Sequence, residues 1–157
     1  MHATAREFFE SAREAARDAE RIRRQLDAME SRSLSLGGGG FEGRVRFTPD
    51  PDRIGASVSA MLDQTERLRE RADEDYAIID AACRVLYGAD NRSGLYALVG
   101  WPADAIYHHY LALRTWEATA AMLGYSVQHV RRQVLYALDL ADANGQMWTE
   151  LGRGMAT

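Results

Sequence analysis

The 157-residue sequence has a single cysteine, three prolines and no long apolar run. One cysteine excludes an intramolecular disulfide and fits a reducing compartment. Because no stretch is apolar enough for a signal peptide or a membrane span, we expect a cytoplasmic protein without a membrane partner. Lysine is absent as well, and 19 arginines stand against 23 acidic residues for a net charge of −4. Any binding of nucleic acid therefore requires a local basic patch.

Motifs for catalysis, metals and cofactors are also lacking. The four glycines from Gly37 to Gly40 are not followed by the Lys-Ser or Lys-Thr of a phosphate loop. His108 and His109 are adjacent, so on a helix they point about 100° apart and do not suit one metal ion. Cys83 lies in an apolar run, which favours a small buried side chain over a nucleophile. We expect a protein that is not an enzyme, with no catalytic residue, metal or cofactor.

Two long segments have the heptad pattern of paired helices. The first runs from Phe8 to Met29 and the second from Asp52 to Leu86, with a glycine-rich loop at about residues 32–51 between them. The apolar positions of the first segment are Phe8, Ala12, Ala15, Ala19, Ile22, Leu26 and Met29. Those of the second are Val58, Met61, Thr65, Leu68 and Ala72, then, after a one-residue skip resembling a stutter, Tyr76, Ile79, Cys83 and Leu86. The pattern predicts an antiparallel helical hairpin over residues 1–87.

The hairpin is also expected to associate with another copy of the chain. Its apolar stripe is narrow and rich in alanine, so it buries less surface than a small bundle normally needs. A second copy would cover the remaining apolar surface. We therefore expect a homo-oligomer, with a dimer as the default state.

Residues 93–143 are predicted to form a compact domain of four short helices. Within it, Thr115 is a predicted N-cap for a helix from Trp116 to Leu123, and Gly124 ends that helix in a left-handed turn. Ser126 then caps a second helix. Two short helices joined by a tight glycine turn are typical of a helix-turn-helix. The expected fold is all-α: a long coiled-coil-like hairpin, a helix-turn-helix domain at 93–143, and a tail at 144–157.

The second helix of this motif has a buried face and an outward face. Val130, Val134, Ala137 and Leu138 share one face at helical spacing, and no acidic residue interrupts Ser126 to Tyr136. Side chains on the outward face can donate hydrogen bonds to phosphates and base edges, while a solvated helix face is the alternative interpretation. Trp116 is interpreted as a core residue. The candidate DNA-binding residues are Arg114, Thr115, Ser126, Gln128, His129, Arg131, Arg132 and Tyr136.

The segment from Tyr110 to Leu138 resembles region four of the bacterial sigma-70 factors. It resembles more closely a group of small phage and prophage proteins that are distantly similar to the RinA and ArpU late-transcription regulators. The matching residues are Tyr110, Leu111, Trp116, Glu117, Ala120, Leu123, Gly124, Tyr125, Ser126, Val130, Arg132, Ala137 and Leu138. The resemblance implies a phage protein that binds double-stranded DNA and regulates transcription.

Three functions follow from these observations as hypotheses. The favoured one is a DNA-binding transcriptional regulator, in which the hairpin mediates oligomerisation or contact with host RNA polymerase. The second is a DNA-packaging component resembling a small terminase subunit, in which a helix-turn-helix and a coiled coil also occur together. The third is a coiled-coil scaffolding module that does not bind DNA. Ring-shaped oligomers would favour the packaging role.

Overall fold

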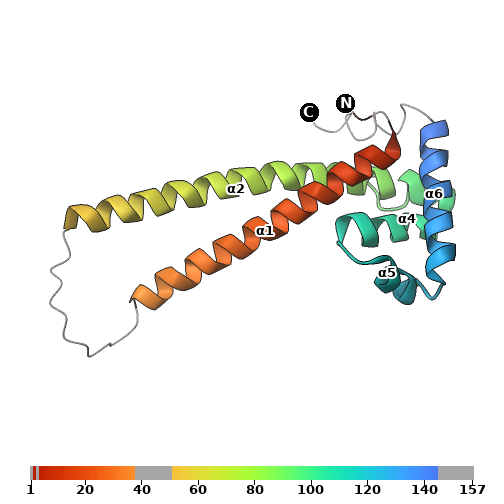
Figure 1. Cartoon of the computed structure of the whole chain (residues 1–157). Helices are drawn as coiled ribbons and strands as arrows, with labels where there is room; N and C mark the ends of the chain where they lie inside the picture. Colours follow the sequence, from red (N-terminus) through yellow and green to blue (C-terminus); the bar gives the residue numbers. More distant parts are fainter. Residues whose placement is uncertain (1, 3, 38–50, 145–157) are drawn as a thin grey trace. The chain divides into compact units, whose positions relative to one another are not determined.

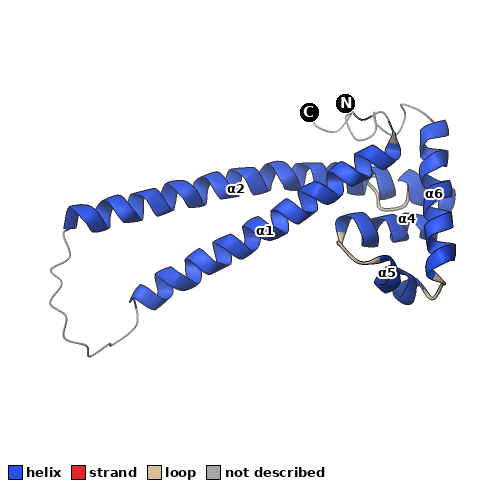
Figure 2. Cartoon of the chain, viewed as in Figure 1, coloured by secondary structure: helices blue, strands red, loops and turns tan. Residues whose placement is uncertain are grey.

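The computed structural model describes residues 2, 4–37 and 51–144, and all regular structure in this part is helical (Figures 1 and 2). This confirms the all-α prediction. None of the described helices is long and apolar enough to cross a membrane. The helices are α1 (Ala5–Gly37), α2 (Pro51–Tyr87), α3 (Gly94–Val99), α4 (Trp101–Ile106), the π-helical turn η1 (Tyr107–Leu111), α5 (Trp116–Leu123) and α6 (Val127–Ala143).

The chain divides into two compact units whose boundary differs from the expected one. The terminal unit contains Met1–Asp18 and Asp75–Thr157, and the middle unit contains Ala19–Glu74. The expected division fell at residues 87–93, between the hairpin and the helix-turn-helix domain. In the structure, the start of α1 and the end of α2 belong with the short C-terminal helices. The antiparallel pairing of α1 and α2 stays a prediction.

One apolar core holds the terminal unit together. Phe9 of α1 and Leu86 of α2 are fully buried in the same cluster as Ile106 and Val134 of the C-terminal helices. At the start of α1, the backbone N–H of Ala5 donates to Asp142 at the end of α6 (N to Oδ1 2.6 Å). The C-terminal helices therefore complete their core with residues that lie about a hundred positions earlier in the chain.

In the middle unit, α1 extends further than the sequence predicted. The glycine-rich loop was expected from about residue 32, but the helix continues to Gly37. Ser31 Oγ donates to the carbonyl of Asp27 (2.9 Å), and Ser33 Oγ donates to that of Glu30 (2.9 Å). Because these hydroxyls bond back into the preceding turn, the serines are accommodated within the helix. The rest of the glycine-rich loop and the tail from residue 145 lie outside the described residues.

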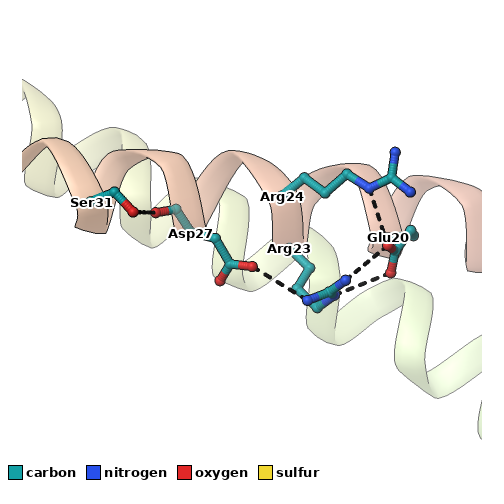
Figure 3. Close-up of polar contacts among 5 residues, drawn as sticks. All are labelled: Glu20, Arg23, Arg24, Asp27 and Ser31. Atoms are coloured by element: carbon teal, nitrogen blue, oxygen red, sulfur yellow. Dashed lines mark hydrogen bonds and ion pairs between the residues drawn. The ribbon is translucent and has the colours of Figure 1, made fainter.

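Exposed ion pairs line the same stretch of α1 (Figure 3). Glu20 accepts hydrogen bonds from Arg23 (Nη2 to Oε1 2.9 Å) and from Arg24 (Nε to Oε1 3.1 Å). Arg23 also donates to Asp27 (Nη1 to Oδ2 3.3 Å). The hydrogen bond from Arg23 is the main reason why the pKa of Glu20 lies below its usual value. Such pairs at spacings of three and four support a helix that has a narrow apolar stripe.

The predicted stutter in α2 is wrong. Tyr76, which was expected to resume the apolar stripe, is 51% exposed. Asp75 is half-buried instead, and Ala82 is fully buried where the prediction placed Cys83. The heptad pattern therefore continues without a skip. The prediction chose Tyr76 and Cys83 because they are the larger apolar residues, but the inward positions are those of Asp75 and Ala82. The buried and half-buried positions of the pattern are Met61, Thr65, Leu68, Ala72, Asp75, Ile79, Ala82 and Leu86.

Candidate nucleic-acid interface

The turn between α5 and α6 has the local geometry that the sequence predicts. Thr115 caps α5, since its Oγ1 accepts from the N–H of Ala118 (3.1 Å), and Ser126 caps α6 by accepting from the N–H of His129 (3.2 Å). Gly124 has φ 76° and ψ 28°, the left-handed conformation that glycine adopts without steric cost. Both predicted caps and the glycine turn are confirmed.

The two faces of α6 differ as its apolar spacing predicts. Val130, Val134, Ala137 and Leu138 are buried, and α6 packs against α4 and α5. Most of the candidate DNA-binding side chains are exposed. These are Arg114, Thr115, Ser126, Gln128, Arg131, Arg132 and Tyr136. The exposed polar groups of α6 therefore lie on a helix whose opposite face anchors it to the core.

His129 lies in an aromatic cluster that was not expected. Trp101, at the start of α4, stacks on Tyr125 with ring centroids 4.3 Å apart and planes 19° apart. The ring of His129 lies 5.3 Å from that of Tyr125 and 5.6 Å from that of Trp101. This half-buried histidine therefore helps to fix the turn before α6 against α4. Its predicted contact with DNA stays a prediction.

Trp116 was interpreted as a core residue, and the structure shows it half-buried and packed against the core. Its ring stacks on His109, with centroids 3.7 Å apart and planes 18° apart, and meets Tyr110 edge-on at 6.5 Å. The guanidinium carbon of Arg131 lies 5.8 Å from the centroid of the Trp116 ring. A guanidinium at this distance from an indole ring is attracted to its π-system. Trp116 thus connects the buried His109 with an exposed arginine of α6.

His109 is held as a neutral imidazole. An Arg13 Nη1 group donates to its Nε2, so Nε2 must be the acceptor nitrogen, while Nδ1 carries the proton and donates to the carbonyl of Arg114 (2.9 Å). Protonation of Nε2 would place a second cation against Arg13. Burial and the charge of Arg13 accordingly lower the pKa of His109 to about 4.

The π-helical turn η1 brings Arg114 back to His109. The N–H of Ala112 donates to the carbonyl of Tyr107 (3.0 Å), and that of Arg114 donates to the carbonyl of His108 (3.0 Å). The helix that begins at Trp101 thus changes from α-helical to π-helical geometry at Tyr107. The wider turn and the positive φ of Leu113 (60°) reverse the chain toward α5.

Arg13 and Arg17 of α1 were not among the candidates. Arg13 contacts His109 across 96 positions of sequence, and the charge of Arg17 also lowers the pKa of His109. Neither residue is among the apolar positions of the first heptad segment, so the sequence pattern places both on the solvated side of that helix. The available signal was their spacing, since two arginines four positions apart repel each other along one helix face.

Comparisons with known proteins place the chain in no family. No protein-family model, curated protein or solved structure matches it.

The other reactive or ionisable side chains do not form a candidate catalytic or metal site in the described part of the chain. Burial raises the pKa of the Cys83 thiol, which disfavours the reactive thiolate. The hydroxyl of Tyr87 donates to Asp104 (Oη to Oδ1 2.7 Å) and ties α2 to α4 within the terminal unit. Within residues 2, 4–37 and 51–144, no three His, Cys, Asp or Glu residues are grouped to hold a metal ion. The basic and aromatic surface of α5 and α6 is thus the strongest candidate site.

Proposed function

We propose that this chain is a phage or prophage DNA-binding protein that regulates transcription and inserts the start of α6 into the major groove. The observation that carries the proposal is the exposed set of Gln128, Arg131, Arg132 and Tyr136 on a helix whose opposite face is buried. Arginine pairs with guanine or phosphate, and glutamine pairs with adenine. A helix anchored in this way presents those groups with little freedom to move, which favours specific recognition.

The electrostatics of α6 support the proposal despite the net charge of −4. No acidic residue occurs from Ser126 to Tyr136. In the described part of the chain, neither Arg131 nor Arg132 forms an ion pair, so both positive charges are available to an anionic partner. Phosphate contacts by such groups provide most of the affinity of a protein for DNA.

The test is to measure the binding of Arg131→Ala, Arg132→Ala and the double variant to DNA by fluorescence anisotropy at several salt concentrations. A base-reading arginine should cost roughly 1 to 3 kcal/mol at one base pair, whereas a phosphate-contacting arginine should reduce the salt slope by about one for every sequence. Arg132→Ala should leave the melting temperature unchanged because the side chain is exposed, whereas Arg131→Ala also removes the contact with the Trp116 ring and should lower it slightly.

Arg92→Ala is the matched control, because it removes one exposed arginine from the loop between α2 and α3. It should bind DNA as the parent does. The proposal is overturned if the double variant binds as tightly as the parent. It is also overturned if the parent binds neither random nor phage-genomic DNA at low salt, and the scaffolding hypothesis then replaces it.

We further propose that the protein acts as a homodimer joined through the middle unit. Among the described residues of this unit, the buried apolar side chains are Ala19, Ile22 and Ala72, while Leu34 and Leu62 are 70% and 60% exposed. So small a core does not stabilise two long helices without further burial. The unit has ten arginines against eleven acidic residues, so two copies would not strongly repel each other.

Light scattering at high micromolar concentration should therefore show a dimer. A monomer at that concentration would contradict this part of the proposal. An assembly of eight or more copies would instead favour the DNA-packaging role.

A further inference from the structure

We propose that Arg13 and Arg17 of α1 form, together with Arg131 of α6, a binding site for the DNA phosphate backbone. The site lies on the terminal unit around the His109–Trp116 stack. This inference rests on the proposed DNA binding, and it extends the interface from α5 and α6 onto the N-terminal helix.

Two arginines contact the same pair of stacked aromatic rings, one at each ring of the pair. Arg13 donates to Nε2 of His109, and the ring of His109 stacks on Trp116 at 3.7 Å. The Arg131 guanidinium carbon lies 5.8 Å from the centroid of the same Trp116 ring. Guanidinium groups from α1 and α6 are therefore gathered around one His–Trp pair, although they are 118 positions apart in the sequence.

Arg17 adds a third positive charge to this group. It follows Arg13 by one helical turn on the same face of α1 and is exposed. The charge of Arg17 is close enough to lower the pKa of both Arg13 and His109. The charges of Arg13 and Arg131 act on His109 in the same direction. Three guanidinium groups therefore act together on one side chain.

In the described part of the chain, Arg13, Arg17 and Arg131 form no ion pair. The Nε of Arg13 is buried and has no hydrogen-bond acceptor there. Gathering like charges without direct ion pairs is unfavourable, so the arrangement favours an anion that can accept several guanidinium hydrogen bonds.

A phosphodiester backbone fits this chemistry best. Arginine donors match phosphate oxygens in a bidentate fashion, and phosphate contacts fix the register of a recognition helix on the duplex. Arg131 belongs both to this cluster and to the exposed face of α6, which makes the two surfaces continuous. Free phosphate has the same oxygen chemistry, so the experiment must separate the polymer from the small anion.

The first experiment measures DNA binding by the full-length Arg17→Ala variant across a range of salt concentrations. Loss of one phosphate contact should weaken binding to every sequence alike, by roughly tenfold at low salt, and reduce the salt slope by about one. Arg17→Lys should restore most of the affinity, because it keeps the charge. Arg23→Ala is the matched control on the same helix, since Arg23 is already paired with Glu20 and Asp27.

The second experiment compares melting temperatures in inorganic pyrophosphate and in sodium chloride of equal ionic strength. The parent should be stabilised by pyrophosphate, and Arg17→Ala should lose that stabilisation while Arg23→Ala keeps it. If pyrophosphate stabilises the parent but the parent does not bind DNA, the arginine cluster is a phosphate-binding site and the proposed DNA-binding function is wrong. Weaker DNA binding by Arg17→Ala without any effect of pyrophosphate assigns the site to the polymer alone. If DNA binds Arg17→Ala as tightly and with the same salt slope as the parent, the inference is overturned.

Discussion

Phe9→Ala should lower the free energy of unfolding of the terminal unit by about 3 to 5 kcal/mol, the range typical of a fully buried phenylalanine. Phe9 is 0% exposed and lies in the same core as Leu86 and Val134. Its ring also packs against Tyr110, with centroids 6.0 Å apart. Truncation would leave a cavity where α1 meets the C-terminal helices. Urea unfolding followed by circular dichroism measures the loss.

Leu34→Ala is the control for this prediction. Leu34 belongs to the same helix but is 70% exposed, so its truncation should change the stability by less than about 0.5 kcal/mol. Equal effects of the two substitutions would mean that the N-terminal turns of α1 do not contribute to the core of the terminal unit. The DNA-binding surface would then not include α1.

Lowering the pH from 7 to 4 should destabilise the terminal unit through His109. Its pKa is about 4 in the folded state, below the ordinary value of 6.5, because of burial and the adjacent Arg13. Between these two values the unfolded chain binds a proton that the folded chain does not. The stabilisation is therefore complete above about pH 6.5 and is lost as the pH falls toward 4. The expected loss is on the order of 2 to 3 kcal/mol.

The contribution of His109 is separated from that of other groups by comparison with His109→Gln. Glutamine is neutral at every pH and keeps one donor and one acceptor. Urea unfolding at pH 7, 5.5 and 4 should show a smaller loss for the variant than for the parent, because carboxylates and His108 titrate in both proteins. Identical pH dependence in the two proteins would show that His109 is not held neutral against Arg13.

The connection between His109 and the arginine cluster gives this measurement a second use. Arg13, Arg17 and Arg131 all disfavour its protonated form. An anion bound to these arginines would offset their charge and make protonation of His109 less unfavourable. The pH dependence of stability should therefore become shallower in pyrophosphate if the cluster binds phosphate groups.

The sequence by itself determined the local structure of the α5–α6 turn and the buried face of α6. The caps at Thr115 and Ser126 and the left-handed Gly124 depend on hydrogen bonds and backbone angles within four or five residues. The apolar spacing of Val130 and Val134 likewise identifies a face that must be buried. Interactions of such short range are encoded by neighbouring residues, so a pattern in the sequence is sufficient to predict them.

Only the tertiary structure decided what covers each apolar face and which polar groups meet there. Helical periodicity identifies an inward face of α1 but not its partner. Phe8 was assigned to the apolar stripe of a hairpin, whereas Phe8 is only half-buried and Phe9 lies fully buried in the core with α6. For the same reason, periodicity did not predict the contact of Arg13 with His109. It also placed Tyr76 on the apolar stripe of α2, where the structure has Asp75. These contacts join residues far apart in the chain, or depend on which neighbour best fills a shared core. These contacts depend on side-chain packing across the whole unit, so a local pattern in the sequence is not sufficient to predict them.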